Sequence, residues 1–290
     1  MPAPTVPTGA RATRPWPGDV SRQVLPGAAS TAVAALVGGP RLAGEVVAAT
    51  RTMTAVLVDH GAGPVLLCVT GPAAVRLPCA VVTPWPVSGL RPGQPALVGD
   101  GELRVGDDAG GAVVTVGRWW RVRPAVIGDV ALARRRTAGQ DDHPWLDGAV
   151  VAAAGRLGLA LLCGDDDELA DAAAGLLGLG PGLTPAGDDV LAGALVTGAA
   201  TGPRAATRLA AAVEAAGPLR RTTAVSAGLL PYAAGGLAVP QLAAYLTALG
   251  AARGDVGAAE RGLLAVGHTS GAALRLGARV ALAALAGAAR

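Results

Sequence analysis

The 290-residue chain contains no lysine, because all 24 of its basic residues are arginine. Without a lysine amine there is no Schiff base to a carbonyl substrate, no anchor for pyridoxal phosphate and no P-loop lysine. Enzymes that depend on those groups are therefore excluded. The chain is still long enough for one large domain or two modest ones with their own cores.

Aromatic residues are also scarce, with no phenylalanine, two tyrosines and five tryptophans. The net charge of +3 is not concentrated, since residues 1–150 carry 14 arginines against 11 acidic residues and 151–290 carry 10 against 10. Neither half is a basic domain, and the chain has no aromatic platform on which bases would stack. Nucleic acid is therefore not an expected partner.

Cysteine is rare as well. Cys68, Cys79 and Cys163 each lie in an apolar context, and none has the CxxC or Cys/His spacing of a zinc site. We expect buried, reduced thiols and a cytoplasmic protein. Residues 1–19 contain five prolines and no apolar core of a signal peptide, which predicts a flexible Pro-rich tail.

The longest uncharged stretch, Thr222–Ala252, has the length of a membrane span. It is interrupted by Pro231, Gly235-Gly236 and Pro240, and much of its hydropathy comes from alanine. Two short helices joined by a turn explain it better. We therefore expect no membrane association.

Valine and alanine divide the chain into unlike parts. Residues 1–150 contain 24 of each, whereas 151–290 contain 9 valines and 42 alanines. β-Branched residues favour strands and alanine favours helices. The sequence therefore predicts an α+β protein. Its expected parts are a tail at 1–19, a β-rich barrel- or sandwich-like domain at 20–133, a linker or surface loop at 134–148 and an all-helical domain at 149–290.

Short apolar runs between Gly/Pro turns indicate the strands. The expected strands are Glu45–Thr50, Thr54–Val58, Val65–Val69, Ala80–Thr83, Ala96–Val98, Glu102–Val105 and Val113–Val116. Ser21–Val37 is expected to contribute a short helix ahead of them. In the second part, leucines at helical spacing, such as Leu242, Leu246 and Leu249, predict helices, and the small residues around them allow close helix packing.

The densest motif, GLGPGLTPAGDD, runs from Gly178 to Asp189. Thr184 suits a helix N-cap and Pro185 the first turn, and the glycines would leave backbone N–H groups open to a phosphate or carboxylate. Asp188 and Asp189 suit the helix dipole, a polar substrate or a Mg²⁺ ion, although no cofactor is certain. The alternative is a capped helix after a glycine turn. Walker A and GxGxxG patterns do not fit.

A second polar cluster follows Arg220-Arg221. The hydroxyls of Thr222, Thr223 and Ser226 fall on one face of a helix, and arginine beside threonine suits an oxyanion. The alternative is an ordinary N-cap.

The third cluster is Gly267–Gly271, in which His268 precedes Thr269 and Ser270. His268 among small residues is a candidate general base or substrate donor, with a structural histidine as the alternative. The segment is not a nucleophile elbow, because GxSxG would place serine at position 269.

Two charged runs are expected to be structural. Asp165–Glu168 precedes an apolar segment and predicts a helix cap rather than a metal site. Arg118–Arg123, which includes Trp119 and Trp120, predicts strand and edge packing, with the mouth of a ligand site as the alternative.

The segments GLGPGLTPAGDDVLAG, RTTAVSAGLL and GHTSGAAL, in this order, resemble a family that includes the AllH-type subunit of oxamate carbamoyltransferase of the allantoin pathway. The resemblance covers about 176–285 and is looser over 20–125. It implies a cytosolic protein involved in transferring a carbamoyl group between a ureido acid and phosphate. It also implies two other kinds of subunit, one of them similar to acyl-CoA synthetases of the succinyl type.

The family pattern falls on residues of all three motifs. These are Gly180, Gly182, Thr184, Gly187, Asp188, Asp189, Thr222, Thr223, Ser226, His268, Thr269 and Ser270. Relatives often carry serine where this chain has Ala186, so that hydroxyl is dispensable here or the chemistry differs.

Three hypotheses follow for the function. In the first, an enzyme or enzyme subunit handles carbamoyl phosphate or a ureido or amide substrate, with the Gly180–Gly187 amides holding the anion, Thr222 and Thr223 contacting the carbamoyl group and His268 moving a proton. The second is a stand-alone enzyme that forms or cleaves amides in specialised metabolism. The third is a non-catalytic binding or scaffolding subunit. The sequence is compatible with assembly with partner subunits and with a homo-oligomer.

Overall fold

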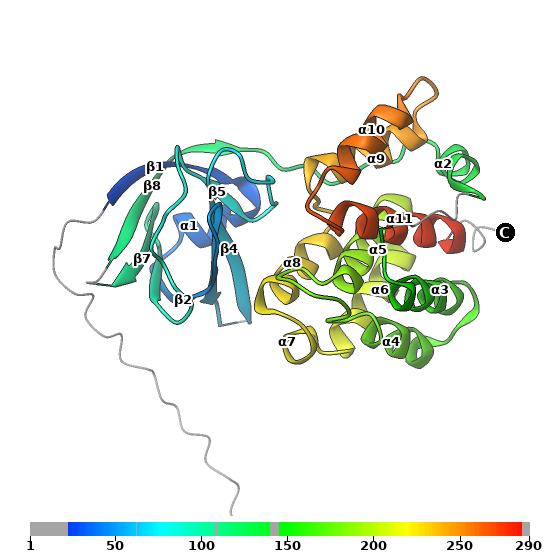
Figure 1. The fold of residues 1–290 in the computed structure, drawn as a ribbon, viewed down its shortest axis with the longest axis horizontal. Coiled ribbons are helices and arrows are strands. Elements are labelled where there is room, and N and C mark those ends of the chain that lie inside the picture. Colours follow the sequence, from blue (N-terminus) through cyan, green and yellow to red (C-terminus); the bar gives the residue numbers. More distant parts are fainter. Residues whose placement is uncertain (1–22, 62, 108–109, 140–144, 286–290) are drawn as a thin grey trace, which may run out of the picture.

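The computed structural model describes residues 23–61, 63–107, 110–139 and 145–285. The expected tail at 1–19 lies outside these residues. Figure 1 shows the described chain as a β-rich part beside a helical part, as the α+β prediction requires.

Within the described residues, eight strands close into a barrel in the order β1-β5-β4-β3-β2-β6-β7-β8. They are β1 (Gln23–Ser30), β2 (Leu42–Ala49), β3 (Met53–Asp59), β4 (Pro64–Thr70), β5 (Ala80–Val82), β6 (Pro95–Gly99), β7 (Glu102–Asp107) and β8 (Gly110–Trp120). The barrel closes where β1 pairs with β8 in parallel, with a register shift between Gly27 and Ala28. Of the two expected architectures, the barrel is therefore confirmed.

Every expected strand overlaps an observed one. The short helix expected within Ser21–Val37 is confirmed at the end of that segment, whereas the strand before it was not expected. Gln23–Ser30 forms β1, and the chain becomes helical only in η1 (Thr31–Val33) and α1 (Ala34–Gly38). The physical reason is alternation, because Leu25 is fully buried in the barrel core while the neighbouring Val24 is 69% exposed.

Two of the three cysteines lie in the barrel core. Cys68 and Cys79 are fully buried free thiols whose sulfur atoms are 3.8 Å apart. The hydrogen bond with Cys79 raises the pKa of the Cys68 thiol, and burial raises it further, so this thiol stays protonated. The expectation of burial is wrong for Cys163, which is exposed at the end of a helix.

The rest of the described chain is helical. The helices are α2 (Val130–Thr137), α3 (Gly148–Cys163), α4 (Asp166–Ala174), α5 (Ala186–Thr201), α6 (Pro203–Ala215), α7 (Pro218–Arg221), α8 (Ala224–Ala234), α9 (Pro240–Gly250), α10 (Val256–Leu264) and α11 (Ser270–Leu285). The expected boundary at 133/134 falls inside α2. None of these described helices combines the length and hydropathy that crossing a bilayer requires.

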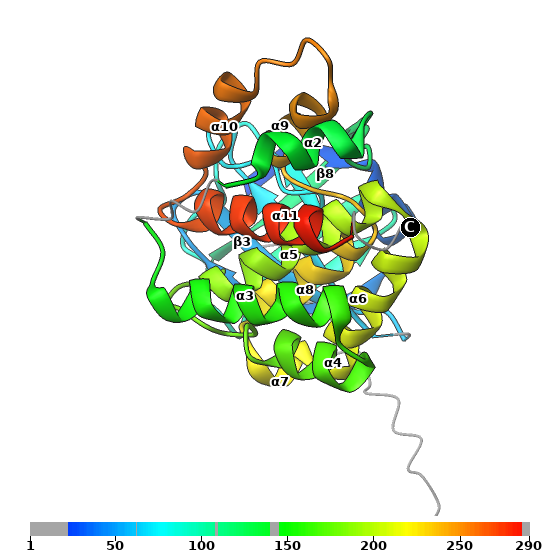
Figure 2. The same ribbon diagram turned by 90° about the vertical axis from the view of Figure 1, so that its right-hand side faces the viewer.

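The predicted close packing of small-residue helices is clearest between α5 and α11, which cross in Figure 2. A Cβ on Gly193 would lie 2.2 Å from the carbonyl oxygen of Leu274, and one on Gly277 would lie 1.9 Å from that of Val190. Both distances are far below van der Waals contact, so only glycine fits at either position. This packing fixes the start of α11 beside the start of α5.

Helix α8 joins the two parts of the molecule, and it lies on the side of the helical part that faces the barrel in Figure 1. The Tyr232 hydroxyl donates a hydrogen bond of 2.8 Å to the carbonyl oxygen of Leu66 in β4. A Cβ on Gly228 would lie 2.5 Å from the Leu66 Cβ, and Val225 packs into the barrel core. The barrel is therefore held directly against the helix that carries the second motif.

The two charged runs have structural explanations. Asp165 and Glu168 form a capping box at the start of α4, which confirms the predicted cap. Trp119 and Trp120 end strand β8, as predicted, and the guanidinium of Arg76 lies 5.6 Å from the Trp120 ring centroid.

Candidate functional site

A cavity of about 300 Å³ lies between the rim of the barrel and the helical part. Its barrel side includes Met53, Val75 and Leu77, and its helical side includes Leu229 and Leu274. The volume is at the small end of the range of ligand pockets, and most of the lining is aliphatic. Because the cavity is shared by both parts of the molecule, their docking through α8 determines its shape.

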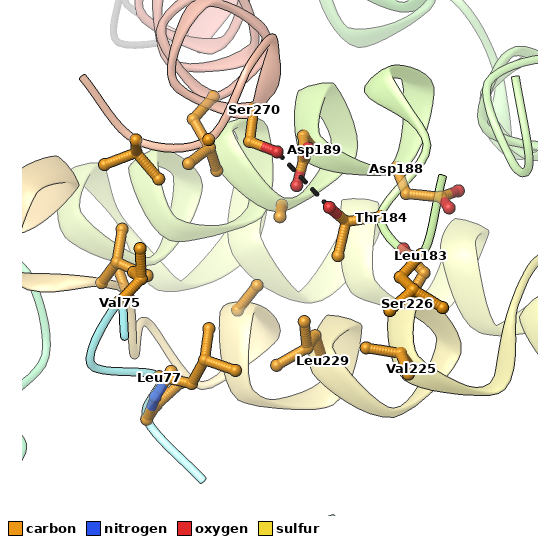
Figure 3. Close-up of a pocket in the computed structure, with 18 of the residues that line it drawn as sticks. Val75, Leu77, Leu183, Thr184, Asp188, Asp189, Val225, Ser226, Leu229 and Ser270 are labelled. Atoms are coloured by element: carbon orange, nitrogen blue, oxygen red, sulfur yellow. Dashed lines mark hydrogen bonds between the residues drawn. The ribbon is translucent and has the colours of Figure 1, made fainter. Parts of the chain in front are cut away.

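The three sequence motifs meet at one end of this cavity. Thr184, Asp188 and Asp189 come from the start of α5, Ser226 from α8 and Ser270 from the start of α11. Figure 3 shows these side chains on one side of the cavity, with Val75 and Leu77 on another. The fold therefore brings together polar groups that are widely separated in the sequence.

Two glycines of this motif, one in the loop ahead of α5 and one in its first turn, are required by close backbone contacts. Gly187 is the tightest, because a Cβ there would lie 2.1 Å from the carbonyl oxygen of Leu176. Gly178 has φ +74°, and a Cβ would lie 2.3 Å from the carbonyl oxygen of Arg221. The loop is therefore pressed between the preceding turn and the segment that carries the second motif.

The predicted N-cap at Thr184 is wrong. Pro185, in an extended conformation, takes the N-cap position of α5, and no side chain caps this helix. Since the helix begins one residue later than expected, the Thr184 hydroxyl faces the cavity instead. Its Oγ1 lies 3.4 Å from the Ser270 Oγ.

The backbone amides at this helix start are largely used within the loop. The Gly187 amide donates to the Leu179 carbonyl at 2.8 Å, and the amides of Asp188 and Asp189 donate to the Pro185 carbonyl at 3.0 and 3.1 Å. Gly180, Gly182 and Gly187 are not among the residues that line the cavity. An anion at this helix start would therefore have to displace existing hydrogen bonds.

Asp188 is 2% exposed and both of its carboxylate oxygens are occupied. Oδ1 accepts a hydrogen bond of 2.9 Å from the Gly178 amide, and Oδ2 accepts a short one from the Thr222 hydroxyl. The carboxylate thus joins the glycine loop, helix α5 and the second motif. Hydrogen bonds to an ionised acceptor are the stronger kind, so this is a structural clamp.

Asp189 has a different environment. Its Oδ2 is shielded from solvent and has no hydrogen-bond partner. The pKa of its carboxyl is raised from 3.8 to about 7, mainly by burial. Hydrogen bonds from Ser270 and Thr184 act in the opposite direction, and the charge of Asp188 adds to the increase. In Figure 3 the two neighbouring carboxylates point in different directions, with that of Asp189 toward Thr184 and Ser270.

The second motif divides between structure and cavity. Thr223 caps α8 by accepting from the Ser226 amide at 3.0 Å, as the alternative of an ordinary N-cap requires. Its hydroxyl donates to the Leu183 carbonyl at 2.6 Å. Thr222 is bound to Asp188. Only Ser226 of the three hydroxyl residues lines the cavity.

The third motif also divides. Ser270 and Gly267 line the cavity, but His268 and Thr269 between them do not. His268 is exposed to solvent in the turn that connects α10 to α11. A proton-transfer role for His268 would therefore require a partner or ligand that reaches outside the cavity.

The charge in the cavity is negative. Asp188 and Asp189 are the charged residues among the described ones that line it, and no arginine or histidine joins them. Ionised acids inside an aliphatic wall repel phosphate and carboxylate groups and favour hydrogen-bond donors. The cavity is therefore suited to a neutral amide or ureido group rather than to a free anion.

A divalent ion fits these residues poorly. No group of three or more His, Cys, Asp or Glu side chains within the described ranges is arranged to hold a metal. The carboxylate of Asp188 accepts from an amide and a hydroxyl, so Mg²⁺ would have to replace both donors.

The barrel side of the cavity was not expected from the sequence. Val75, Leu77 and Pro78 lie in the segment between β4 and β5 and contribute only apolar surface. Such residues carry no motif, and their role depends on how the barrel docks against α8. No signal in the sequence alone distinguishes them from ordinary barrel residues.

Comparison with known proteins supports the resemblance of the motifs. Residues 176–282 match the family described as oxamate carbamoyltransferase subunit AllH, so the predicted relationship is confirmed for this stretch. The match includes the motifs at the polar end of the cavity and does not include the barrel, which precedes it in the sequence. Neither the curated proteins nor the solved structures gave a match to this chain.

Proposed function

We propose that this chain is the substrate-binding subunit of a carbamoyltransferase-type enzyme, and that its cavity holds the amide or ureido group of the substrate. The AllH match over residues 176–282 supplies the reaction class. The observation that carries the proposal is the Asp189 carboxyl, which lies in the wall of a cavity without a cationic residue among its described lining and whose Oδ2 has no donor. A carbamoyl or amide NH₂ group is a donor from which this carboxyl would accept a hydrogen bond.

Asp189 is the group we assign to proton transfer. In carbamoyl transfer from a ureide to phosphate, a phosphate oxygen forms a bond to the carbamoyl carbon, the C–N bond breaks and the leaving nitrogen gains the proton that phosphate loses. A carboxyl with a pKa of about 7 is suited to relaying that proton near neutral pH. Thr184, Ser226 and Ser270 orient the amide, and Asp188 positions Asp189 by holding the first turn of α5 in place.

Phosphate is bound by groups outside this cavity in our proposal, and a partner subunit is the natural source of them. We therefore expect the chain to act in a complex in the cytoplasm, where Cys68 and Cys79 remain reduced thiols. His268, exposed beside the cavity, is positioned to contribute from the partner-facing side.

The test is binding of a primary amide to the purified full chain, with butanamide as the probe and N,N-dimethylbutanamide as the matched ligand without N–H donors. We expect butanamide to bind and the dimethyl compound to bind at least tenfold more weakly. Affinity for butanamide should rise as the pH passes 7, because the ionised carboxylate is the better acceptor. Equal binding of the two amides would contradict the proposal.

Comparing the variants Asp189→Leu and Leu159→Asn distinguishes a loss of amide binding in the cavity from a general effect of substitution on the fold. Leu159 is 63% exposed on α3, away from the cavity, so its variant is the control. Asp189→Leu should lose at least tenfold in affinity for butanamide and Asp189→Asn should recover part of it. If Asp189→Leu bound butanamide as well as Leu159→Asn did, Asp189 would not be the acceptor.

A second candidate is a subunit that binds the substrate without transforming it. The absence of a cationic group among the described lining residues favours it, since phosphate then has no favourable site in this cavity. Assays of the chain with phosphate and a ureide, with and without Mg²⁺, test this second candidate. Carbamoyl phosphate formed by the chain alone would exclude this second candidate.

A further inference from the structure

The cavity is divided into a polar and an apolar end. Figure 3 shows Asp189, Thr184 and Ser270 grouped together, while Val75 and Leu77 lie across the cavity from them. Leu229 of α8 forms part of the apolar wall between the two ends. A ligand with its N–H donors at Asp189 would therefore place the rest of its structure against aliphatic side chains.

The apolar end offers no counterpart for a second charged group. The barrel rim contributes Thr50, but its hydroxyl is engaged in its own turn, where it donates to the Met53 carbonyl at 3.2 Å and accepts from the Met53 amide at 3.1 Å. The other barrel residues that line the cavity are Thr52, Met53, Thr70, Ala74, Val75, Leu77 and Pro78, so this side is largely apolar and none of these described residues is cationic. A carboxylate here would be buried without a cation, which is unfavourable.

The cavity is also larger than a minimal carbamoyl acceptor requires. Its volume of about 300 Å³ corresponds to roughly ten water molecules at ~30 Å³ each. Oxamate is a short anion whose carboxylate adjoins its amide, so it would leave the apolar end empty and place its charge near Asp188 and Asp189. Both the size and the polarity of the cavity therefore favour a different acceptor.

We propose that the cavity selects a primary amide or ureide that carries a neutral hydrocarbon body of several carbons, with the amide at Asp189 and the hydrocarbon against Val75, Leu77 and Leu229. This inference rests on the proposed function and specifies its substrate class. The barrel is then the specificity-determining part of the chain, because its β4–β5 segment closes the apolar end.

A homologous series of linear primary amides, from acetamide to octanamide, tests this inference by titration into the full chain. Burial of each added methylene should tighten binding about fourfold until the cavity is full. Oxamate should bind more weakly than butanamide. A series with no dependence on chain length, or oxamate as the tightest ligand, would overturn the inference.

Two variants locate the hydrocarbon. Leu77→Asn and Val75→Thr alter partly exposed side chains, so both should leave the fold intact. We expect Leu77→Asn to reduce the gain per methylene to less than about twofold, with acetamide binding almost unchanged. Val75→Thr keeps the shape of the side chain and should weaken only the longer amides. Leu162→Asn, at a position 56% exposed on α3, should behave as the wild type.

The outcomes distinguish this inference from the proposed function. If the amides bind with a dependence on Asp189 but without a dependence on chain length, the proposed function stands and the hydrocarbon-bearing substrate is wrong. If chain length matters but Asp189→Leu has no effect, the cavity binds hydrocarbons and the amide proposal fails. If no amide binds the wild-type chain, both fail.

Discussion

The first turn of α5 has two sides that differ in almost every physical respect, although each carries an aspartate. On the clamp side, Asp188 accepts hydrogen bonds from the Gly178 amide and the Thr222 hydroxyl, so its charge is compensated. On the cavity side, Asp189 has a shielded oxygen without a donor and a pKa raised to about 7. Consecutive residues on a helix point in different directions, so one dipeptide serves two environments.

The difference shows that one motif combines a structural residue with a candidate binding residue. On the clamp side, the Asp188 carboxylate holds the glycine loop, helix α5 and the second motif together, and this requires an ionised acceptor. The cavity side keeps an acceptor unsatisfied, which destabilises the free protein and is compensated only when a donor arrives. Changes on the two sides should therefore affect stability in opposite directions.

The largest effect should come from Gly187→Ala, which removes the close approach on which the clamp side depends. The new Cβ would meet the Leu176 carbonyl oxygen at 2.1 Å, and a backbone neighbour cannot move aside as a side chain would. We expect a loss of about 4 kcal/mol in the free energy of unfolding, measured by denaturant titration. Gly155→Ala, in open space on α3, is the control and should be neutral or stabilising.

Asp189→Asn should stabilise the protein at alkaline pH. The folded-state pKa of Asp189 lies above its unfolded value, so between about pH 4 and 7 the native state holds a proton that the unfolded chain has lost. Wild-type stability therefore falls as the pH rises through this window. We expect the variant to exceed the wild type by about 3 kcal/mol at pH 8 and to match it near pH 4. A constant difference at all pH values would show that burial does not shift this carboxyl.

Asp188→Asn should have the opposite sign. The amide can accept from one of the two donors, but its NH₂ group then faces the other, and the charge-assisted bonds are lost. A loss of about 2 kcal/mol is expected at pH 8, measured beside Asp189→Asn under identical conditions. Stabilisation by both variants would contradict the division into a clamp side and a cavity side.

Thr223→Ala should have the smallest effect, about 1 kcal/mol, because it removes the N-cap of α8 and one bond to the Leu183 carbonyl. Thr223→Ser keeps both hydrogen bonds and is the control. Amide binding should be nearly unchanged in both, since Thr223 does not line the cavity.

The sequence predicted the architecture because valine and alanine report local preferences. The barrel strands, the helical second part and the capping residues Asp165 and Thr223 all follow from local patterns. Strand β1 was missed because its place depends on β8, about ninety residues away along the chain. Long-range pairing of this kind leaves little trace in a short window.

The sequence was enough to predict which polar residues form the candidate site, but not what each of them does. The motifs identified Asp188, Asp189, Ser226 and Ser270, which the fold brings to one cavity. Which aspartate is satisfied depends on Gly178 and Thr222, and the identity of the apolar wall depends on the docking of the barrel. Those relations are tertiary, so the same sequence pattern is compatible with an anion site or an amide site.

The most direct measurement is the titration of the Asp189 carboxyl by ¹³C NMR in the full chain, with Asp189→Asn used to assign the signal. We predict a midpoint near pH 7 that moves toward lower pH when hexanamide is saturating, because the N–H donors stabilise the ionised form. A midpoint near 4 that hexanamide leaves unchanged would contradict the claim that Asp189 is the shielded acceptor of the cavity.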